Sequence, residues 1–159
     1  MRIRIAAVGK LNKKYLKDAQ AEYVKRLSRF ASVDIAEIPE ARLPDNPSAR
    51  QVAQALEKES RRIQKAAAGF DSILVLAVEG KPYTSETFAR QIEKTAESGR
   101  PDMCFIIGSS YGLSPEVKHI ATSTVSFSSM TFPHQLFRII LLEQAYRAFK
   151  IIRRETYHK

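Results

Sequence analysis

The chain has 159 residues, 44% of them hydrophobic and 27% charged, which excludes a disordered or collagen-like protein and favours a single domain over residues 1–159. Its one cysteine, Cys104, excludes an intrachain disulfide and a cysteine-based zinc site. With no apolar run long enough to span a bilayer either, we expect a cytoplasmic protein with no metal and no membrane contact. The net charge of +9 is uneven: residues 1–30 carry +7, residues 31–132 carry −2 and residues 133–159 carry +4.

Strand-like and helix-like patterns alternate along the chain. Alternating or continuous apolar residues with β-branched side chains indicate strands, and apolar residues three or four positions apart indicate helices. The expected strands are 2–8, 33–38, 72–78, 103–107 and 124–127, and the expected helices are 13–27, 48–68, 85–98, 117–121 and 133–152. This alternation predicts an α/β fold with a mostly parallel sheet flanked by helices.

Ligands of open parallel sheets bind beyond the carboxyl ends of the strands. Three segments fall there, namely 78–83, 108–112 and 127–133. The turn 108–112 has glycines but matches neither dinucleotide nor phosphate-loop spacing, so a plain strand-to-helix turn is the favoured alternative. The loop 127–133 is rich in hydroxyls and suits a nucleoside, although it also reads as a capping loop with Pro133 at the first helical position.

The helix expected at 133–152 is apolar on most of its faces. Such a helix must be buried on most faces, and a terminal helix of a small α/β domain usually packs only one face on the sheet. We therefore predict a homodimer through this helix. Deep burial of the helix within one subunit is the alternative.

The basic segments at the two ends have two interpretations. If they meet in the fold, they form one positive patch suited to phosphate. A basic surface that only keeps the protein soluble is the plainer alternative.

Several longer stretches resemble one family. They run from Ser126 to Arg138, from Leu142 to Lys150 and from Tyr157 to Lys159, with shorter matches at 8–11, at Leu76, at 79–81 and at 105–108. Together they resemble the ribosomal RNA large subunit methyltransferase H family of the SPOUT superfamily, over essentially the whole chain. The resemblance implies a SPOUT-type fold with a C-terminal trefoil knot, and S-adenosylmethionine as the cofactor.

The resemblance also implies which residues line the cofactor pocket. By matching positions they are Leu76, Gly108, Phe127, Ser128, Ser129, Met130, Thr131 and Phe132. One departure concerns the turn after the fourth strand, where similar proteins have Gly-Gly and this chain has Gly108-Ser109. Tyr111 is also bulky for that turn.

The implied reaction is methylation of N3 of a pseudouridine in 23S rRNA within the assembled ribosome. His158 is the candidate general base for this reaction. Tyr157 would stack on the nucleobase, and Arg154 would hold phosphate. Because the tail is short, we expect it to reach the pocket of the partner subunit. Lys10, Lys13, Lys14, Lys17 and Lys159 are the candidate RNA contacts.

Two other functions remain open at this stage. A non-catalytic RNA-binding or ribosome-associated module with a decayed pocket would explain Ser109 and Tyr111. A different α/β nucleotide enzyme is disfavoured in its dinucleotide form, because no GxGxxG motif follows the first strand.

Overall fold

Five parallel strands form one sheet in the order β2-β1-β4-β3-β5 in the computed structural model, which describes residues 1–157. The strands are β1 Arg2–Val8, β2 Ser32–Ile38, β3 Ser72–Pro82, β4 Asp102–Ile107 and β5 Ser123–Ser126. The helices are α1 Lys14–Leu27, α2 Ala49–Ala67, α3 Ser85–Glu97, α4 Pro115–His119 and α5 His134–Ile152. The expected α/β fold with a parallel sheet flanked by helices is confirmed.

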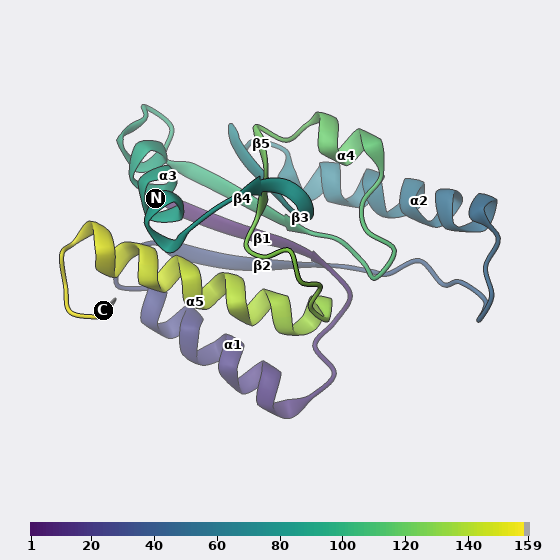
Figure 1. The fold of residues 1–159 in the computed structure, drawn as a ribbon, viewed down its shortest axis with the longest axis horizontal. Helices are drawn as coiled ribbons and strands as arrows, with labels where there is room; N and C mark the ends of the chain where they lie inside the picture. The colour runs from purple at the N-terminus through teal and green to yellow at the C-terminus, as the bar shows by residue number, and fades with distance from the viewer. Residues whose placement is uncertain (158–159) are drawn as a thin grey trace.

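Helices cover both faces of the sheet (Figure 1). Ile3 and Ile5 of β1 point into a core shared with α1, α3 and α5, whereas Ala6 and Val8 belong to a second core shared with α2 and α4. Adjacent side chains of a strand point to opposite faces, so a strand covered on both sides is apolar throughout. This explains the continuous apolar runs in β3 and β4.

Side-chain caps explain where three helices begin. Ser48 and Thr84 each form a reciprocal capping box at the start of α2 and α3, and Ser114 accepts a hydrogen bond from the backbone N–H of Val117 in α4. These caps leave fewer N–H groups of the first turn without a partner. The starts of α2 and α3 fall within one residue of those expected from the sequence, at 48 and 85.

Three expected boundaries were wrong. The helix α4 begins at Pro115 rather than at Val117, because Ser114 caps it and Pro115 occupies its first turn. Pro133 is not the first helical residue; with φ −53° and ψ 130° it lies just outside α5. The third strand runs on to Pro82 instead of ending at residue 78, since its chain bulges outward and then pairs again with β5.

The helix α5 lies between α1 and α3, and it runs parallel to α1. The parallel direction follows from three contacts: Asn12 donates to Gln135 at one end, Tyr23 meets Tyr146 in the middle, and Phe30 stacks on Phe149 at the other end. Burial within one subunit therefore accounts for much of the apolar character of this helix. Leu136, at its amino-terminal end, remains 41% exposed.

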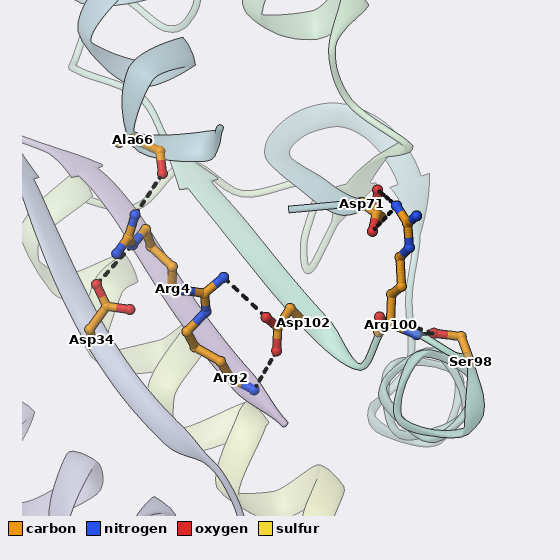
Figure 2. A network of polar contacts seen from close by, with 8 residues as sticks. All are labelled: Arg2, Arg4, Asp34, Ala66, Asp71, Ser98, Arg100 and Asp102. Carbon is orange, nitrogen blue, oxygen red and sulfur yellow. Dashed lines mark hydrogen bonds and ion pairs between the residues drawn. The ribbon is translucent and has the colours of Figure 1, made fainter. Parts of the chain in front are cut away.

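A polar network ties the amino ends of the strands together (Figure 2). Arg4 donates to Asp34 of β2 and to the carbonyl oxygen of Ala66 in α2, and Arg2 pairs with Asp102 of β4. Both guanidinium groups lie over the ring of Phe70. Two of the nine basic residues of the first thirty are thus used within the fold.

We predict that Cys104 is unreactive in the folded protein. It is fully buried in β4, and burial raises the pKa of its thiol to about 12, so almost no thiolate exists near neutral pH. A disulfide reagent such as 5,5′-dithiobis(2-nitrobenzoate) at pH 8 should label it only in denaturant, with the onset of labelling following the unfolding transition. Rapid labelling of the native protein would contradict the burial.

Candidate functional site

A cavity of about 510 Å³ opens at the carboxyl ends of β3, β4 and β5. All three segments that were expected to meet there contribute to its wall. Seven of the eight residues matched to the family's cofactor pocket line it, and Ser129 does not: the seven are Leu76, Gly108, Phe127, Ser128, Met130, Thr131 and Phe132. The fold therefore gathers residues that lie up to 56 positions apart in the sequence (76 to 132) around one space.

An outward excursion of β3 forms one wall. Both Leu76 and Lys81 are aligned with Val125 of β5, so residues 77–80 leave the ladder and rejoin it. Gly80 makes the return feasible, because a Cβ there would lie 2.6 Å from the carbonyl carbon of Val125. The excursion turns Val78 and Glu79 toward the cavity rather than into the sheet.

The turn after β4 forms the second wall. Gly108 has no room for a side chain, since a Cβ would lie 2.5 Å from the carbonyl oxygen of Gly112. The Ser109 hydroxyl donates to the buried carboxylate of Glu59 in α2 at 3.1 Å, and Tyr111 is 47% exposed. The two departures from the family pattern therefore leave the cavity open, because the serine hydroxyl is engaged by α2 and the tyrosine lies at the rim.

The loop 127–133 forms the third wall and is held by its own polar groups. Ser126 donates to the carbonyl oxygen of Ser128, whose hydroxyl accepts from the backbone N–H of Met130. The ring of Phe127 packs on Phe88 and Phe137 behind the loop. Backbone groups and apolar side chains thus face one space, an arrangement that suits a ligand with both a polar edge and flat apolar faces.

Among residues 1–157, two charged side chains lie in the cavity wall, those of Glu79 and Lys118. The sequence had marked only the stretch 79–81, through its resemblance to the family. Lys118 of α4 donates to Glu79 at 2.5 Å. This hydrogen bond, together with a backbone hydrogen bond, holds the pKa of Glu79 below its usual value. No sequence signal marks Lys118, because it meets β3 only through the tertiary fold.

Arg154 and Tyr157 lie at the opposite end of α5 from the cavity. Tyr157 packs edge-on against Tyr146, lies under the guanidinium of Arg147 and donates to Glu143 at 3.2 Å. Burial raises its pKa to about 12, which keeps the hydroxyl protonated. Arg154 is exposed, with a positive φ of 55°. His158 and Lys159 fall outside the described residues.

The separation between tail and cavity is set by the helix itself. A helix of 19 residues rises about 28 Å. The first turn of α5 borders the cavity through His134 and Phe137, and Tyr157 follows its last turn. The structure therefore does not bring Tyr157 or Arg154 to the cofactor residues within one chain.

The basic segments at the two chain ends do meet, because α1 packs on α5. Lys10, Lys13, Lys14 and Lys17 are exposed at the end of α1 that adjoins the first turn of α5, and Lys14 pairs with Asp18. This lysine cluster thus lies at the same end of α5 as the cavity. Arg147 and Arg153 lie at the other end, against aromatic rings.

Arg138 was named in the sequence only as the end of a stretch that resembles the family, and the structure gives it a structural role. It is completely buried, donates to the carbonyl oxygen of Gly9 and to Glu37 at 2.8 Å each, and leaves its Nε without a partner. His134 lies beside the same Gly9. The first two turns of α5 therefore connect the cavity loop with the segment that precedes the lysine cluster.

Within residues 1–157, no group of three side chains could hold a metal ion, and no helix is long and apolar enough to cross a membrane.

Comparisons with known proteins match this chain over essentially its full length. The family model described as predicted SPOUT methyltransferase matches residues 1–158. Proteins named ribosomal RNA large subunit methyltransferase H from Streptococcus thermophilus and Streptococcus pneumoniae are 46% and 47% identical, with all of this chain and all of each relative covered. A crystal structure described as a probable methyltransferase from Bordetella pertussis has a TM-score of 0.60 at 14% identity, covering 92% of this chain and 93% of that chain, and this likeness bears on the fold alone.

Proposed function

We propose, since this chain belongs to the ribosomal RNA large subunit methyltransferase H family within the SPOUT methyltransferases, that it methylates N3 of a pseudouridine in 23S rRNA with S-adenosylmethionine as methyl donor. The observation that carries this proposal is the cavity at the carboxyl ends of β3, β4 and β5. Its wall includes seven of the residues matched to the family's cofactor pocket. The C-terminal part of the chain would be threaded as the family's trefoil knot.

The cavity suits the cofactor's mixed chemistry. Backbone groups of loop 127–133 and of the turn at Gly108 can hydrogen-bond an adenine edge, while Leu76 and Phe132 can pack on its faces. The cofactor supplies an electrophilic methyl group on a sulfonium, which becomes a neutral thioether when the methyl bonds to N3. Holding that methyl in line with the nitrogen accounts for much of the rate gain in such a transfer.

The tail would supply the groups that act on the RNA. N3 of a pseudouridine must lose its imide proton as the new bond forms, and the imidazole of His158 would accept it. The ring of Tyr157 would stack on the base, and Arg154 and Lys159 would hold phosphate. Since Tyr157 lies a helix length from the cavity of its own chain, these groups would act in a partner's pocket.

A two-fold homodimer through residues 133–152 would satisfy this geometry. If the two α5 helices ran antiparallel, the tail of one subunit would lie beside the first helical turn and the cavity of the other. The exposed apolar residues Met130, Phe132 and Leu136 lie at that end of the helix. Each active site would then be composite, with cofactor residues from one subunit and the tail from the other.

The RNA would lie over the lysine cluster, and the substrate would be 23S rRNA within the assembled ribosome in the cytoplasm. The cluster adjoins the first turn of α5 and hence the cavity. A patch of this kind binds phosphate with little regard to sequence and would orient the RNA toward the pocket.

We predict that the lysine cluster sets the salt dependence of RNA binding. Changing Lys10, Lys13 and Lys17 to glutamine should flatten the slope of log K against log salt by about 2 to 3, since each lost phosphate contact removes about 0.7–0.9. Filter binding of ribosomes between 50 and 300 mM KCl measures this. Glutamines at Lys58, Lys65 and Lys94 remove the same charge from α2 and α3 and should leave the slope unchanged. If the wild-type protein and the triple variant had the same slope, the lysine cluster would not bind RNA phosphate.

Two measurements test the proposal. Calorimetric titration of S-adenosylmethionine tests the cofactor, and mass spectrometry of nucleosides from treated ribosomes tests the product. We expect binding, and a methyl-pseudouridine that is absent when the ribosomes come from cells unable to form pseudouridine at the target. Ribosome binding without cofactor binding would instead favour a non-catalytic module and point to Ser109 and Tyr111.

A further inference from the structure

The cavity wall is almost neutral apart from one ion pair. Among residues 1–157, Glu79 and Lys118 are the only aspartate, glutamate, lysine or arginine residues that line it. The two charges come from different elements of the fold. Glu79 lies on the outward excursion of β3, and Lys118 lies on α4.

The ion pair between Glu79 and Lys118 contributes little to the stability of the fold. The side chains of Lys118 and Glu79 are 40% and 61% exposed, and exposed ion pairs contribute little to stability. Yet the chain leaves the ladder of β3 to place Glu79 here, and Gly80 is needed for its return. A weakly held pair in a pocket wall is also one that a ligand can displace, since each partner can exchange its hydrogen bond for one to the ligand.

The cofactor named in the proposed function has two chemically distinct ends. Its nucleoside end is flat and uncharged, which suits the apolar side chains and backbone groups of loop 127–133. Its amino-acid end carries an α-ammonium and an α-carboxylate. A carboxylate beside an ammonium in an otherwise neutral wall is the complement of that end, and charge-assisted hydrogen bonds are the stronger kind.

We propose that Glu79 and Lys118 form the subsite for the amino-acid end of the cofactor. On binding, the carboxylate of Glu79 accepts from the α-ammonium and the ammonium of Lys118 donates to the α-carboxylate, in place of the direct contact between the two side chains. The subsite discriminates cofactor and its demethylated product from nucleosides that lack the amino acid. This inference rests on the proposed use of S-adenosylmethionine.

The test compares two ligands that differ only at this end. S-adenosylhomocysteine keeps the amino acid, whereas 5′-methylthioadenosine lacks it. For Glu79→Gln and for Lys118→Met, calorimetry should show affinity for S-adenosylhomocysteine reduced roughly tenfold or more, because each loses a charge-assisted hydrogen bond. Affinity for 5′-methylthioadenosine should stay within about twofold of wild type, since that ligand does not reach the pair.

Two controls separate a ligand contact from a structural one. Glu57→Gln and Lys94→Met make the same charge changes on α2 and α3 and should alter neither affinity. Exchange of the pair, Glu79→Lys with Lys118→Glu, keeps an ion pair but reverses its direction. It should keep a thermal midpoint close to that of the wild-type protein and still lack the wild-type affinity for S-adenosylhomocysteine.

The outcomes are distinct. Equal losses for both ligands, no loss for either, or recovery of S-adenosylhomocysteine binding in the exchanged variant would each overturn the subsite. Failure of the wild-type protein to bind either ligand would instead overturn the proposed cofactor, and with it the premise of the subsite.

Discussion

Alanine in place of His158 is expected to lower the single-turnover rate of methyl transfer to ribosomes by about 10²–10⁴-fold, the range for loss of a general acid or base. The reason is that the N3 imide proton then has no acceptor at the reacting atom. The rate should be measured with saturating cofactor and excess enzyme over ribosomes. Affinity for S-adenosylmethionine should be unchanged, since the tail acts on the RNA and not on the cofactor.

Two variants at Tyr157 test whether its ring stacks on the nucleobase. Tyr157→Phe keeps the ring on Tyr146 and under Arg147 and loses only the hydrogen bonds of the hydroxyl, including the one to Glu143, so it should stay close to wild type. Tyr157→Ala removes the stacking surface and should weaken ribosome binding or slow transfer. His119→Ala makes the same substitution as His158→Ala at a histidine of α4, and it is the matched control for that variant. Unchanged rates for both His158→Ala and Tyr157→Ala would leave the tail without a chemical role.

Mixed dimers test where the tail acts. One subunit would lack residues 157–159, and the other would carry Thr131→Trp, which fills the cavity from an exposed wall position. Calorimetry first establishes that the second subunit no longer binds cofactor. Activity of the mixture above that of either parent supports a composite site, because only the mixed dimer has an intact pocket opposite an intact tail. No recovery in a mixture shown to exchange subunits contradicts it.

Replacing Arg138 with alanine is expected to lower the free energy of unfolding by about 3–5 kcal/mol. The change leaves a cavity in a fully buried site, and it removes the donors to the Gly9 carbonyl and to Glu37. Urea denaturation followed by circular dichroism measures the loss as a shift of the midpoint at constant slope.

A second substitution at Arg138 separates the contribution of its packing to stability from that of its hydrogen bonds. Arg138→Met keeps most of the volume and should cost about 1–3 kcal/mol, mainly from the carbonyl of Gly9 left without a donor. Arg90→Ala on the exposed side of α3 should change stability by less than about 0.5 kcal/mol. A loss below about 1 kcal/mol for Arg138→Ala would mean that the segment at Gly9 does not depend on this contact.

Periodicity predicted the fold well because most segments have consistent local signals. The continuous apolar residues of β3 and β4 indicated strands, and the helices expected from residues 48 and 85 begin within one residue of those positions. The end of β3 was missed because its excursion is set by pairing with Val125, which no local pattern encodes. The start of α4 was missed, although Ser114 followed by Pro115 is a helix-start signal.

The site was predictable in its parts and not in its arrangement. The carboxyl ends of the strands pointed to the three cavity segments, and the family resemblance pointed to the individual residues. Lys118 and Arg138 were missed as site residues because their partners, Glu79 and Gly9, are 39 and 129 positions away. The expectation that the short tail reaches a partner's pocket already implied a separation between Tyr157 and the cavity of its own chain, and the length of α5 sets the size of that separation.

The most direct test of the central claim is transfer of a labelled methyl group from S-adenosylmethionine to ribosomes that lack this modification. We predict stoichiometric labelling of 23S rRNA in assembled ribosomes, weaker labelling of free 23S rRNA, and none with the Thr131→Trp variant. Cofactor binding with no transfer to ribosomes, subunits or free rRNA would contradict the claim that this protein is a 23S rRNA methyltransferase.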